Sequence, residues 1–282
     1  MLDQPQVRER LAGRTAIVTG ASQGIGRGIA VALAECGVSV TAAARNRPKL
    51  DDTCTAIAAS GGRAIAVECD VQKLDQLEAC VARTVDAFGT VDILVNNAQS
   101  ISYRMILDAG VQDMVDAWES GPLAAFALMK LTYPHLRGGG VVVNVGSSST
   151  HLADTSRYAV YNGVKTAMEE LARSAHHEWR ADGISTFTIH PAAESAMTAN
   201  WKAREPEKYA AATAAMPGGR LGDPLEDIGR PLAALVADAP AYSGRTMHID
   251  AAGVRETLET ISEGPFLLPG APAPPDSAGR AE

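Results

Sequence analysis

The sequence predicts a single α/β domain of the doubly wound, Rossmann type, with a parallel sheet of about seven strands and helices on both faces. Three observations support this prediction. Short apolar runs of strand length alternate with longer helical patterns along most of the chain. The runs are apolar throughout, which is typical of strands that are buried on both faces. A glycine-rich turn joins the first run to the first long helix.

The first half of the chain contains four of the expected strands. Runs composed mainly of Ala, Val, Ile and Leu are found at 15–18, 38–44, 63–67 and 93–95. A helix is expected from the glycine-rich turn to about Cys36. Further helices are expected at 50–60 and 74–88, because apolar residues recur there every three to four positions.

The second half continues the alternation. A long helical pattern at 111–136 leads to a Val-rich run at 141–145, and a second long pattern at 158–181 leads to the run at 184–189. A helix that begins near Pro224 precedes the last run at 246–249, since proline is favoured in the first turn of a helix. We expect the crossovers between parallel strands to be right-handed.

Two segments interrupt this alternation. Residues 193–220 follow the carboxyl end of an expected strand, where α/β proteins often place a substrate lid. Their apolar side chains include Met197, Trp201, Tyr209 and Met216. The tail at 264–282 holds five prolines and three glycines and predicts neither helix nor strand, so it is either disordered or held against a partner subunit. We therefore expect one domain at 1–263 followed by this tail.

Composition excludes several classes of protein. The 282 residues are 46% hydrophobic and 21% charged, with a net charge of −8, and the acidic balance argues against a nucleic-acid partner. No stretch reaches the roughly 18 apolar residues of a membrane span, and the N-terminus lacks the pattern of a signal peptide. The cysteines have neither metal-ligand nor CxxC spacing and indicate a reducing compartment: Cys36, Cys54, Cys69 and Cys80. We expect a cytoplasmic protein.

The turn at 19–26 reads TGASQGIG. Gly20 allows a tight turn, Gly24 leaves room for a pyrophosphate beside the backbone, and Gly26 allows the helix to pack close to the sheet. The phosphates would then bind the free N–H groups at the start of the helix. An ordinary strand–helix turn is the alternative. The residues expected to bind a dinucleotide here are Gly20, Ser22, Gln23, Gly24, Ile25 and Gly26.

The glycine spacing, TGxxxGxG, resembles that of the short-chain dehydrogenase/reductase family, and the resemblance extends over about residues 11–253. It includes Asp70-Val71 after the third strand, Asn96-Asn97-Ala98 after the fourth, Ser147 within NVGSS, and the YxxxK motif of Tyr161 and Lys165. The resemblance implies a nicotinamide dinucleotide cofactor. Beyond the glycine-rich turn it implies cofactor contacts at Asp70, Val71, Asn97, Ala98, Tyr161, Lys165 and Pro191.

The end of the second strand bears on the choice of dinucleotide. Enzymes of this fold that use NAD place a carboxylate there for the ribose 2′-hydroxyl, whereas NADP enzymes place an arginine near the 2′-phosphate. Ala44 occupies this position and Arg45 follows it. Gln23 stands where a second cation would strengthen the pattern, and Arg47 is interpreted as a solvated loop charge. We expect NADP(H), with NAD(H) as the alternative.

Tyr161 and Lys165 are one helical turn apart, so their side chains share a face of the helix. A free tyrosine has a pKa of about 10, and we expect the nearby ammonium of Lys165 to lower it. During reduction Tyr161 would protonate the carbonyl oxygen as a hydride arrives from the cofactor. Ser147 would donate a hydrogen bond to the same oxygen. It is preferred to Ser148 because it lies three residues after Asn144, as the catalytic serine of the family does.

Several positions around the expected nicotinamide site depart from the family pattern. Gln99 replaces the glycine of NNAG, and Gly121 stands where an asparagine usually anchors a proton-relay water. Ala192 replaces the glycine after Pro191, and Ala196 replaces a threonine that often contacts the carboxamide, with Ser195 and Thr198 as substitutes. We therefore expect an unusual substrate pocket or slow turnover. No metal site is expected, and four histidines are interpreted as structural or solvated: His151, His176, His177 and His190.

These observations predict an NADP(H)-dependent oxidoreductase that interconverts a ketone and a secondary alcohol, with a small and moderately hydrophobic substrate. Two alternatives stay open. The chain could be a non-catalytic dinucleotide-binding or regulatory protein, or it could catalyse redox-neutral chemistry such as elimination or epimerisation. The resemblance also implies a homotetramer or homodimer built from the helices at 111–136 and 158–181.

Overall fold

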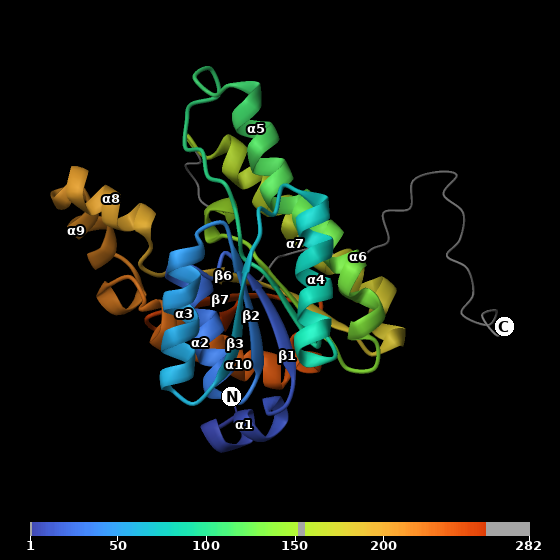
Figure 1. The fold of residues 1–282 in the computed structure, drawn as a ribbon. Helices are drawn as coiled ribbons and strands as arrows, with labels where there is room; N and C mark the ends of the chain where they lie inside the picture. The colour runs from blue at the N-terminus through green and yellow to red at the C-terminus, as the bar shows by residue number, and fades with distance from the viewer. Residues whose placement is uncertain (1, 152–155, 258–282) are drawn as a thin grey trace.

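The fold is an eight-stranded sheet with helices on both faces (Figure 1). The computed structural model describes residues 2–151 and 156–257. The strand order is β3-β2-β1-β4-β5-β6-β7-β8, and every neighbouring pair from β3 to β7 is parallel. This confirms the predicted doubly wound α/β fold. The expected tail at 264–282 lies outside the described residues.

All seven expected strands are present, at bounds close to the apolar runs. They are β1 Thr15–Thr19, β2 Ser39–Ala44, β3 Arg63–Glu68, β4 Ile93–Asn96, β5 Val141–Val145, β6 Ser185–Pro191 and β7 Thr246–Asp250. The sheet also contains an eighth strand, β8 Gly253–Glu256, which pairs antiparallel with β7 and was not expected. The strand has only four residues and is partly exposed, so it lacks the apolar run that reveals a buried strand.

The sheet separates two apolar cores. Ile93 and Val95 of β4 contribute to one core and Leu94 to the other, because successive side chains of a strand point to opposite faces. The first core is covered by α1 Gln4–Leu11, α2 Gly24–Glu35, α3 Arg47–Ala59 and α10 Arg230–Ala237. The second is covered by α4 Leu74–Phe88, α6 Ala124–Leu136 and α7 Ala159–Trp179.

The long helix expected at 111–136 is not continuous. It consists of α5 Val111–Trp118, a π-helical turn at Glu119–Leu123, and α6. Pro122 lies inside this turn, and proline lacks the N–H group that an α-helical hydrogen bond requires. Single π-helical turns of this kind are frequent at functional sites.

The segment at 193–220 forms two short helices, α8 Ala196–Arg204 and α9 Pro206–Ala214, which project from the body of the domain (Figure 1). Trp201 and Tyr209 hold the two helices together, with ring centroids 5.3 Å apart in an edge-on arrangement. The side chain of Met197 lies outside the described residues. In the described part of the chain, no helix is both long and apolar enough to cross a membrane.

The chain reverses its winding direction between β1 and β4. β1 has β2 on one side and β4 on the other, so the connections that leave these strands diverge. In open α/β sheets, ligands bind in the crevice at the carboxyl ends of such strands.

Candidate active site

A cavity of about 420 Å³ opens at this crevice, beyond the carboxyl ends of β1, β2, β3 and β4. Its lining brings together eleven of the residues that were expected to bind the cofactor. These are Gly20, Ser22, Gln23, Gly24, Ile25, Gly26, Arg45, Asp70, Val71, Asn97 and Ala98. Tyr161, Lys165 and Pro191 are not part of its lining.

The glycine-rich turn is held by close backbone packing. A Cβ atom on Gly26 would lie 2.4 Å from the carbonyl oxygen of Gly20, so no larger residue fits at this position. The side chain of Asn97 donates to the carbonyl oxygen of Thr19 at 2.8 Å and ties the β4 loop to the turn. A Cβ atom on Gly24 would meet nothing within 4 Å, so its backbone is open toward the cavity.

The start of α2 fits a phosphate group. Its N-cap residue, Gln23, makes no side-chain cap, so among the described residues no side-chain cap satisfies the N–H groups of the first turn. Such groups, together with the helix dipole, form an anion-binding site. The open backbone at Gly24 and this uncapped terminus therefore suit the pyrophosphate of a dinucleotide.

A second cation lies beside Arg45 at the far end of the cavity. Lys49, in the first turn of α3, donates through Nζ to Oε1 of Gln23 at 2.6 Å, and both side chains line the cavity. Asn46 caps α3 by accepting from the backbone N–H of Lys49 and so sets the position of this lysine. Sequence reasoning missed Lys49. Arg47 pairs instead with Asp51 at 2.9 Å on the surface, as expected of a solvated charge.

The hydroxyl of Tyr161 shares hydrogen bonds with the hydroxyls of Ser147 and Tyr103. Ser147 also lies 2.9 Å from the hydroxyl of Ser149, which donates to Asn162 at 2.6 Å on the first turn of α7. The turn after β5 is thereby fastened to the helix that carries Tyr161. Of the two candidate serines, the structure brings Ser147 to the phenol.

Lys165 is buried one turn below Tyr161. Its Nζ donates to the carbonyl oxygen of Val145 at 2.6 Å and lies 5.6 Å from the centre of the Tyr161 ring. Burial lowers the pKa of Lys165 to about 8, and the carboxylate of Glu169 opposes this shift. The expected lowering of the Tyr161 pKa by Lys165 is wrong for this structure. Burial raises the pKa of Tyr161 and outweighs its hydrogen bonds, and the ammonium is directed to a backbone carbonyl.

Comparison with known proteins decides the family. Residues 14–207 match the model of the short-chain dehydrogenases. The chain belongs to the short-chain dehydrogenase/reductase family. It is 32% identical to a 12α-hydroxysteroid dehydrogenase from Clostridium sp., over 84% of this chain and 95% of the relative. It is 29% identical to the hydroxynaphthalene reductase-like protein Arp2 of Metarhizium acridum, over 83% and 85%.

Solved structures of dehydrogenases have a similar fold. A dehydrogenase/reductase from Sinorhizobium meliloti 1021 superposes with a TM-score of 0.80 at 26% identity, over 89% of this chain and 99% of the other. A 7α-hydroxysteroid dehydrogenase in complex with NADH and 7-oxo glycochenodeoxycholic acid gives a TM-score of 0.77 at 27% identity, over 90% and 98%. The protein is therefore an oxidoreductase of a family that binds NAD(P)(H).

This short-chain dehydrogenase/reductase has an additional tyrosine at its site. The ring of Tyr103 lies 5.1 Å from that of Tyr161 and 5.0 Å from that of Tyr158. Burial raises the pKa of Tyr103, so its hydroxyl stays protonated. Tyr103 lies in the loop after β4, outside any motif, and no sequence signal identified it.

Two departures from the family pattern, Gln99 and Gly121, lie next to each other. A Cβ atom on Gly121 would lie 2.3 Å from Oε1 of Gln99, so the Gln99 side chain as placed here uses the space that a larger residue at 121 would fill. Nε2 of Gln99 donates to the carbonyl oxygen of Ala117 at 2.8 Å, which holds the side chain against the end of α5. Its Oε1 is buried and has no hydrogen-bond partner among the described residues. Gln99 and Ser120 both line the cavity.

Ser195, in the loop between β6 and α8, lines the cavity. Ser195 caps α8 by accepting from the backbone N–H of Thr198 at 3.2 Å. Pro191 is the last residue of β6 and is half-buried. The side chain of Ala196 lies outside the described residues. Of the two substitutes that the sequence offered, Ser195 and Thr198, Ser195 lines the cavity.

Proposed function

We propose that this enzyme interconverts a ketone and a secondary alcohol with NADP(H) as its cofactor. The observation that carries the proposal is the contact between the hydroxyls of Tyr161 and Ser147 above the buried ammonium of Lys165. This arrangement places a proton donor and a second hydrogen-bond donor together, as reduction of a carbonyl requires.

The chain's own residues handle the proton. When bound, the nicotinamide supplies or accepts the hydride. During reduction Tyr161 gives its phenolic proton to the carbonyl oxygen, and during oxidation it takes the proton of the hydroxyl group. Ser147 donates to the same oxygen and stabilises the negative charge that develops there. Lys165, whose pKa is about 8, is mostly protonated at neutral pH, and its hydrogen bond to the carbonyl oxygen of Val145 holds the ammonium 5.6 Å from the centre of the Tyr161 ring.

The preference for NADP(H) rests on the charges at the end of β2. No carboxylate occupies position 44, and Arg45 and Lys49 both line the cavity there. A 2′-phosphate would bind these cations through charge-assisted hydrogen bonds. The 7α-hydroxysteroid dehydrogenase was solved with NADH, so the ratio of kcat/KM for NADPH and NADH tests this point directly. A ratio in favour of NADH would contradict it.

We further propose a moderately hydrophobic cyclic ketone as the substrate. The rings of Tyr103, Tyr158 and Tyr161 form an aromatic cluster beside Ser147, and the similar enzymes named above are hydroxysteroid dehydrogenases and a hydroxynaphthalene reductase-like protein. The helices α8 and α9 would act as the lid over this pocket.

A panel of three carbonyl compounds tests the proposal. A steroid ketone, a small cyclic ketone and a 3-oxoacyl thioester are each mixed with enzyme and NADPH, and the loss of NADPH absorbance is recorded. We expect the steroid or the cyclic ketone to be reduced fastest. Cofactor binding with no turnover of any compound would favour the regulatory alternative. Conversion of a substrate without net loss of NADPH would favour redox-neutral chemistry.

We also propose that the enzyme is a homodimer or homotetramer. Large apolar side chains are exposed together along α5 and the start of α6, and a second copy of the chain would cover them. They are Val111, Met114, Val115, Trp118, Leu123 and Phe126. Light scattering coupled to gel filtration measures the mass, and a monomer would contradict the proposal. A cytoplasmic location stays a prediction.

A further inference from the structure

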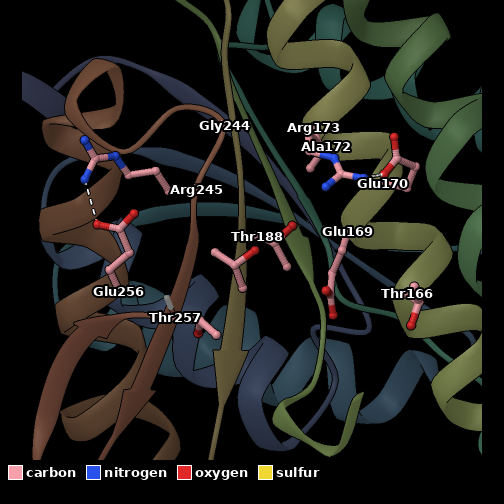
Figure 2. Close-up of a pocket in the computed structure, with 11 residues that line it drawn as sticks. Thr166, Glu169, Glu170, Ala172, Arg173, Thr188, Gly244, Arg245, Glu256 and Thr257 are labelled. Carbon is pink, nitrogen blue, oxygen red and sulfur yellow. Dashed lines mark hydrogen bonds and ion pairs between the residues drawn. The ribbon is translucent and has the colours of Figure 1, made fainter. Parts of the chain in front are cut away.

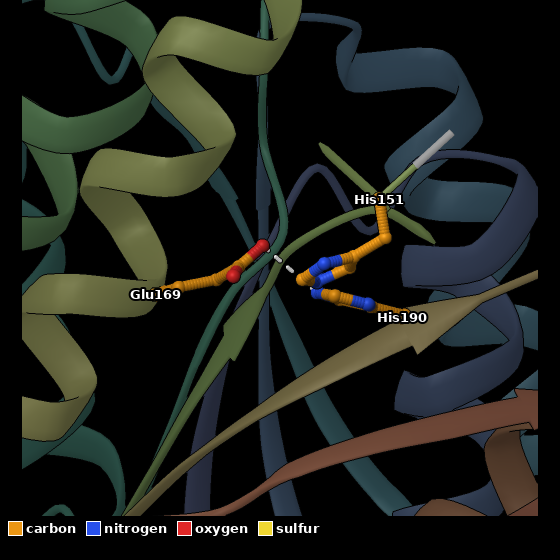
Figure 3. A group of neighbouring side chains, drawn as sticks. All are labelled: His151, Glu169 and His190. Atoms are coloured by element: carbon orange, nitrogen blue, oxygen red, sulfur yellow. Dashed lines mark hydrogen bonds and ion pairs between the residues drawn. The ribbon is translucent and has the colours of Figure 1, made fainter. Parts of the chain in front are cut away.

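A group of three side chains behind the Ser147 turn is not used by the proposed reaction (Figure 3). His151 ends the 3₁₀ turn Ser148–His151, Glu169 lies on α7, and His190 lies on β6. One nitrogen or oxygen atom from each lies within 4.8 Å of the others. Nε2 of His190 is 2.9 Å from Oε1 of Glu169, and the rings of His151 and His190 are 5.6 Å apart. Three elements that are remote in sequence therefore converge here.

The group is buried at one end and accessible at the other. The side chain of His190 is 1% exposed and that of Glu169 is 11% exposed, whereas His151 is exposed. Glu169 also faces a second cavity of about 280 Å³ between α7, β6 and β7, opposite Thr188 (Figure 2). An ion from solvent can therefore reach the carboxylate.

The chemistry of these side chains suits zinc. Two imidazoles and one carboxylate form a ligand set that Zn²⁺ uses in proteins, with a fourth position left for water. His190 and Glu169 are already in contact, with 2.9 Å between Nε2 and Oε1, and the ion would be held by both of these atoms. His248, the partner of His190 on β7, is not a further ligand in this arrangement because its Nε2 lies 3.2 Å from Asp250.

The position of the group connects it to the site of the proposed reaction. Thr150, next to His151, donates to the carbonyl oxygen of Ser147 at 2.8 Å and also contacts Glu169. The His190 ring packs against Gly146, where a Cβ atom would lie 2.8 Å from it. An ion held by all three ligands would thus fasten the turn that carries Ser147 to α7 and β6.

We propose that His151, Glu169 and His190 form a zinc-binding site that fixes the turn of Ser147. The sequence-based expectation was that no metal site exists, because the three ligands come from separate segments with no ligand motif. Zinc binding goes beyond the proposed function and does not depend on it. Only the effect on turnover rests on the proposed reaction.

Zinc binding is measured directly on tag-free, metal-stripped full-length protein by calorimetric titration with zinc sulfate. We expect one ion per chain. His151→Ala should weaken binding at least about tenfold, because the loss of even an outer-shell partner costs that much. His151 is exposed, so this change leaves the core intact. The control is His177→Ala, an exposed histidine on α7, which should bind zinc as the unchanged protein does.

Melting curves and activity complete the test. Zinc should raise the Tm of the unchanged protein and of His177→Ala more than that of His151→Ala or Glu169→Gln at the same zinc concentration. Absence of stoichiometric binding, or equal binding by His151→Ala, would overturn the site. If binding and the Tm shift are found, zinc should also change kcat in the unchanged protein and in His177→Ala, but not in His151→Ala. An unchanged kcat would overturn the link to Ser147. A protein with no turnover at all would leave the binding result standing and count against the proposed function alone.

Discussion

The two ends of the cofactor cleft differ in how they are built. At the adenine end, the turn at 19–26 depends on backbone packing, with Gly26 pressed against Gly20 and an uncapped start of α2. At the nicotinamide end, the site depends on side chains from separate segments, such as Tyr103 and Gln99, which meet only in the folded protein. The first end follows the family pattern, and the departures gather at the second. We therefore expect that changes at the two ends alter cofactor binding and turnover separately.

The largest expected effect is at the nicotinamide end. Tyr161→Phe removes the proton donor and should lower kcat by about 100- to 10,000-fold, the usual contribution of general acid–base catalysis. NADPH binding, measured by calorimetry, should be retained because Tyr161 does not line the cavity at the adenine end. A loss of NADPH binding as large as the loss of turnover would show that the two ends are not separable.

Lys165 provides a test through pH. Its pKa is about 8 in the folded protein and 10.5 as a free group, so the unfolded chain binds more protons between these values. The free energy of unfolding should therefore rise with pH from about 8, relative to that of Lys165→Met, by at most about 1.4 kcal/mol per pH unit. Below pH 8 the buried charge lowers the stability, and the methionine variant should be relatively more stable. Urea unfolding at several pH values measures the difference, and parallel profiles for the two proteins would contradict it.

Gly121→Ala tests the contact between the two departures. The new Cβ atom would displace the amide of Gln99, and the loss of its hydrogen bond to Ala117 should cost about 0.5–1.5 kcal/mol of stability. Gln99→Gly loses the same hydrogen bond by itself, so the double variant should be less destabilised than the sum of the two single variants. The coupling between the positions should be about 0.5–1.5 kcal/mol in a double-mutant cycle of unfolding free energies. Additive effects would mean that the two side chains do not compete for space.

Turnover measurements on Gln99→Gly and on a further variant, Ser120→Ala, test the nicotinamide end directly. Gln99→Gly and Ser120→Ala should both change kcat if these residues shape the nicotinamide end, and the KM for NADPH should change little. A normal kcat in both variants would show that the departures have no consequence for the reaction.

The opposite end of the cleft, the adenine end, is tested by a change of charge. Lys49→Ala removes one charge-assisted hydrogen bond to a 2′-phosphate, worth about 1.5–3 kcal/mol, and should raise the KM for NADPH about tenfold or more. The KM for NADH should not change, since NADH has no phosphate there. Arg47→Ala is the matched control, because Arg47 pairs with Asp51 away from the cavity. Equal effects on NADPH and NADH would remove Lys49 from phosphate recognition.

Sequence reasoning predicted the parts of the fold that depend on buried, continuous patterns. Each of the seven apolar runs became a strand because both faces of the inner sheet are covered by helices. It failed at β8, which is short and partly exposed, and at α1, whose capping box around Asp3 was overlooked. It also treated the segment around Pro122 as continuous helix, although the proline there marks the π-helical turn.

The residues of the candidate active site also divide into those that the sequence predicted and those that it did not. The residues of the glycine-rich turn carry their own signal, because Gly24 and Gly26 are required by local backbone geometry. Lys49 and Tyr103 carry none, since each gains its place from tertiary contacts with Gln23 and Tyr161 respectively. The sign of the Tyr161 pKa shift also depends on burial, which a motif cannot show.

The contact between Gln99 and Gly121 limits the order in which this chain could change over generations. A side chain introduced at position 121 while Gln99 is present would displace the end of the glutamine, because its first atom would overlap the amide. A return to the asparagine that the family usually carries at 121 would therefore proceed more easily after a smaller residue had replaced Gln99. Variants with a larger residue at position 121 should therefore also carry a smaller residue at position 99, whereas a smaller residue at position 99 is compatible with Gly121.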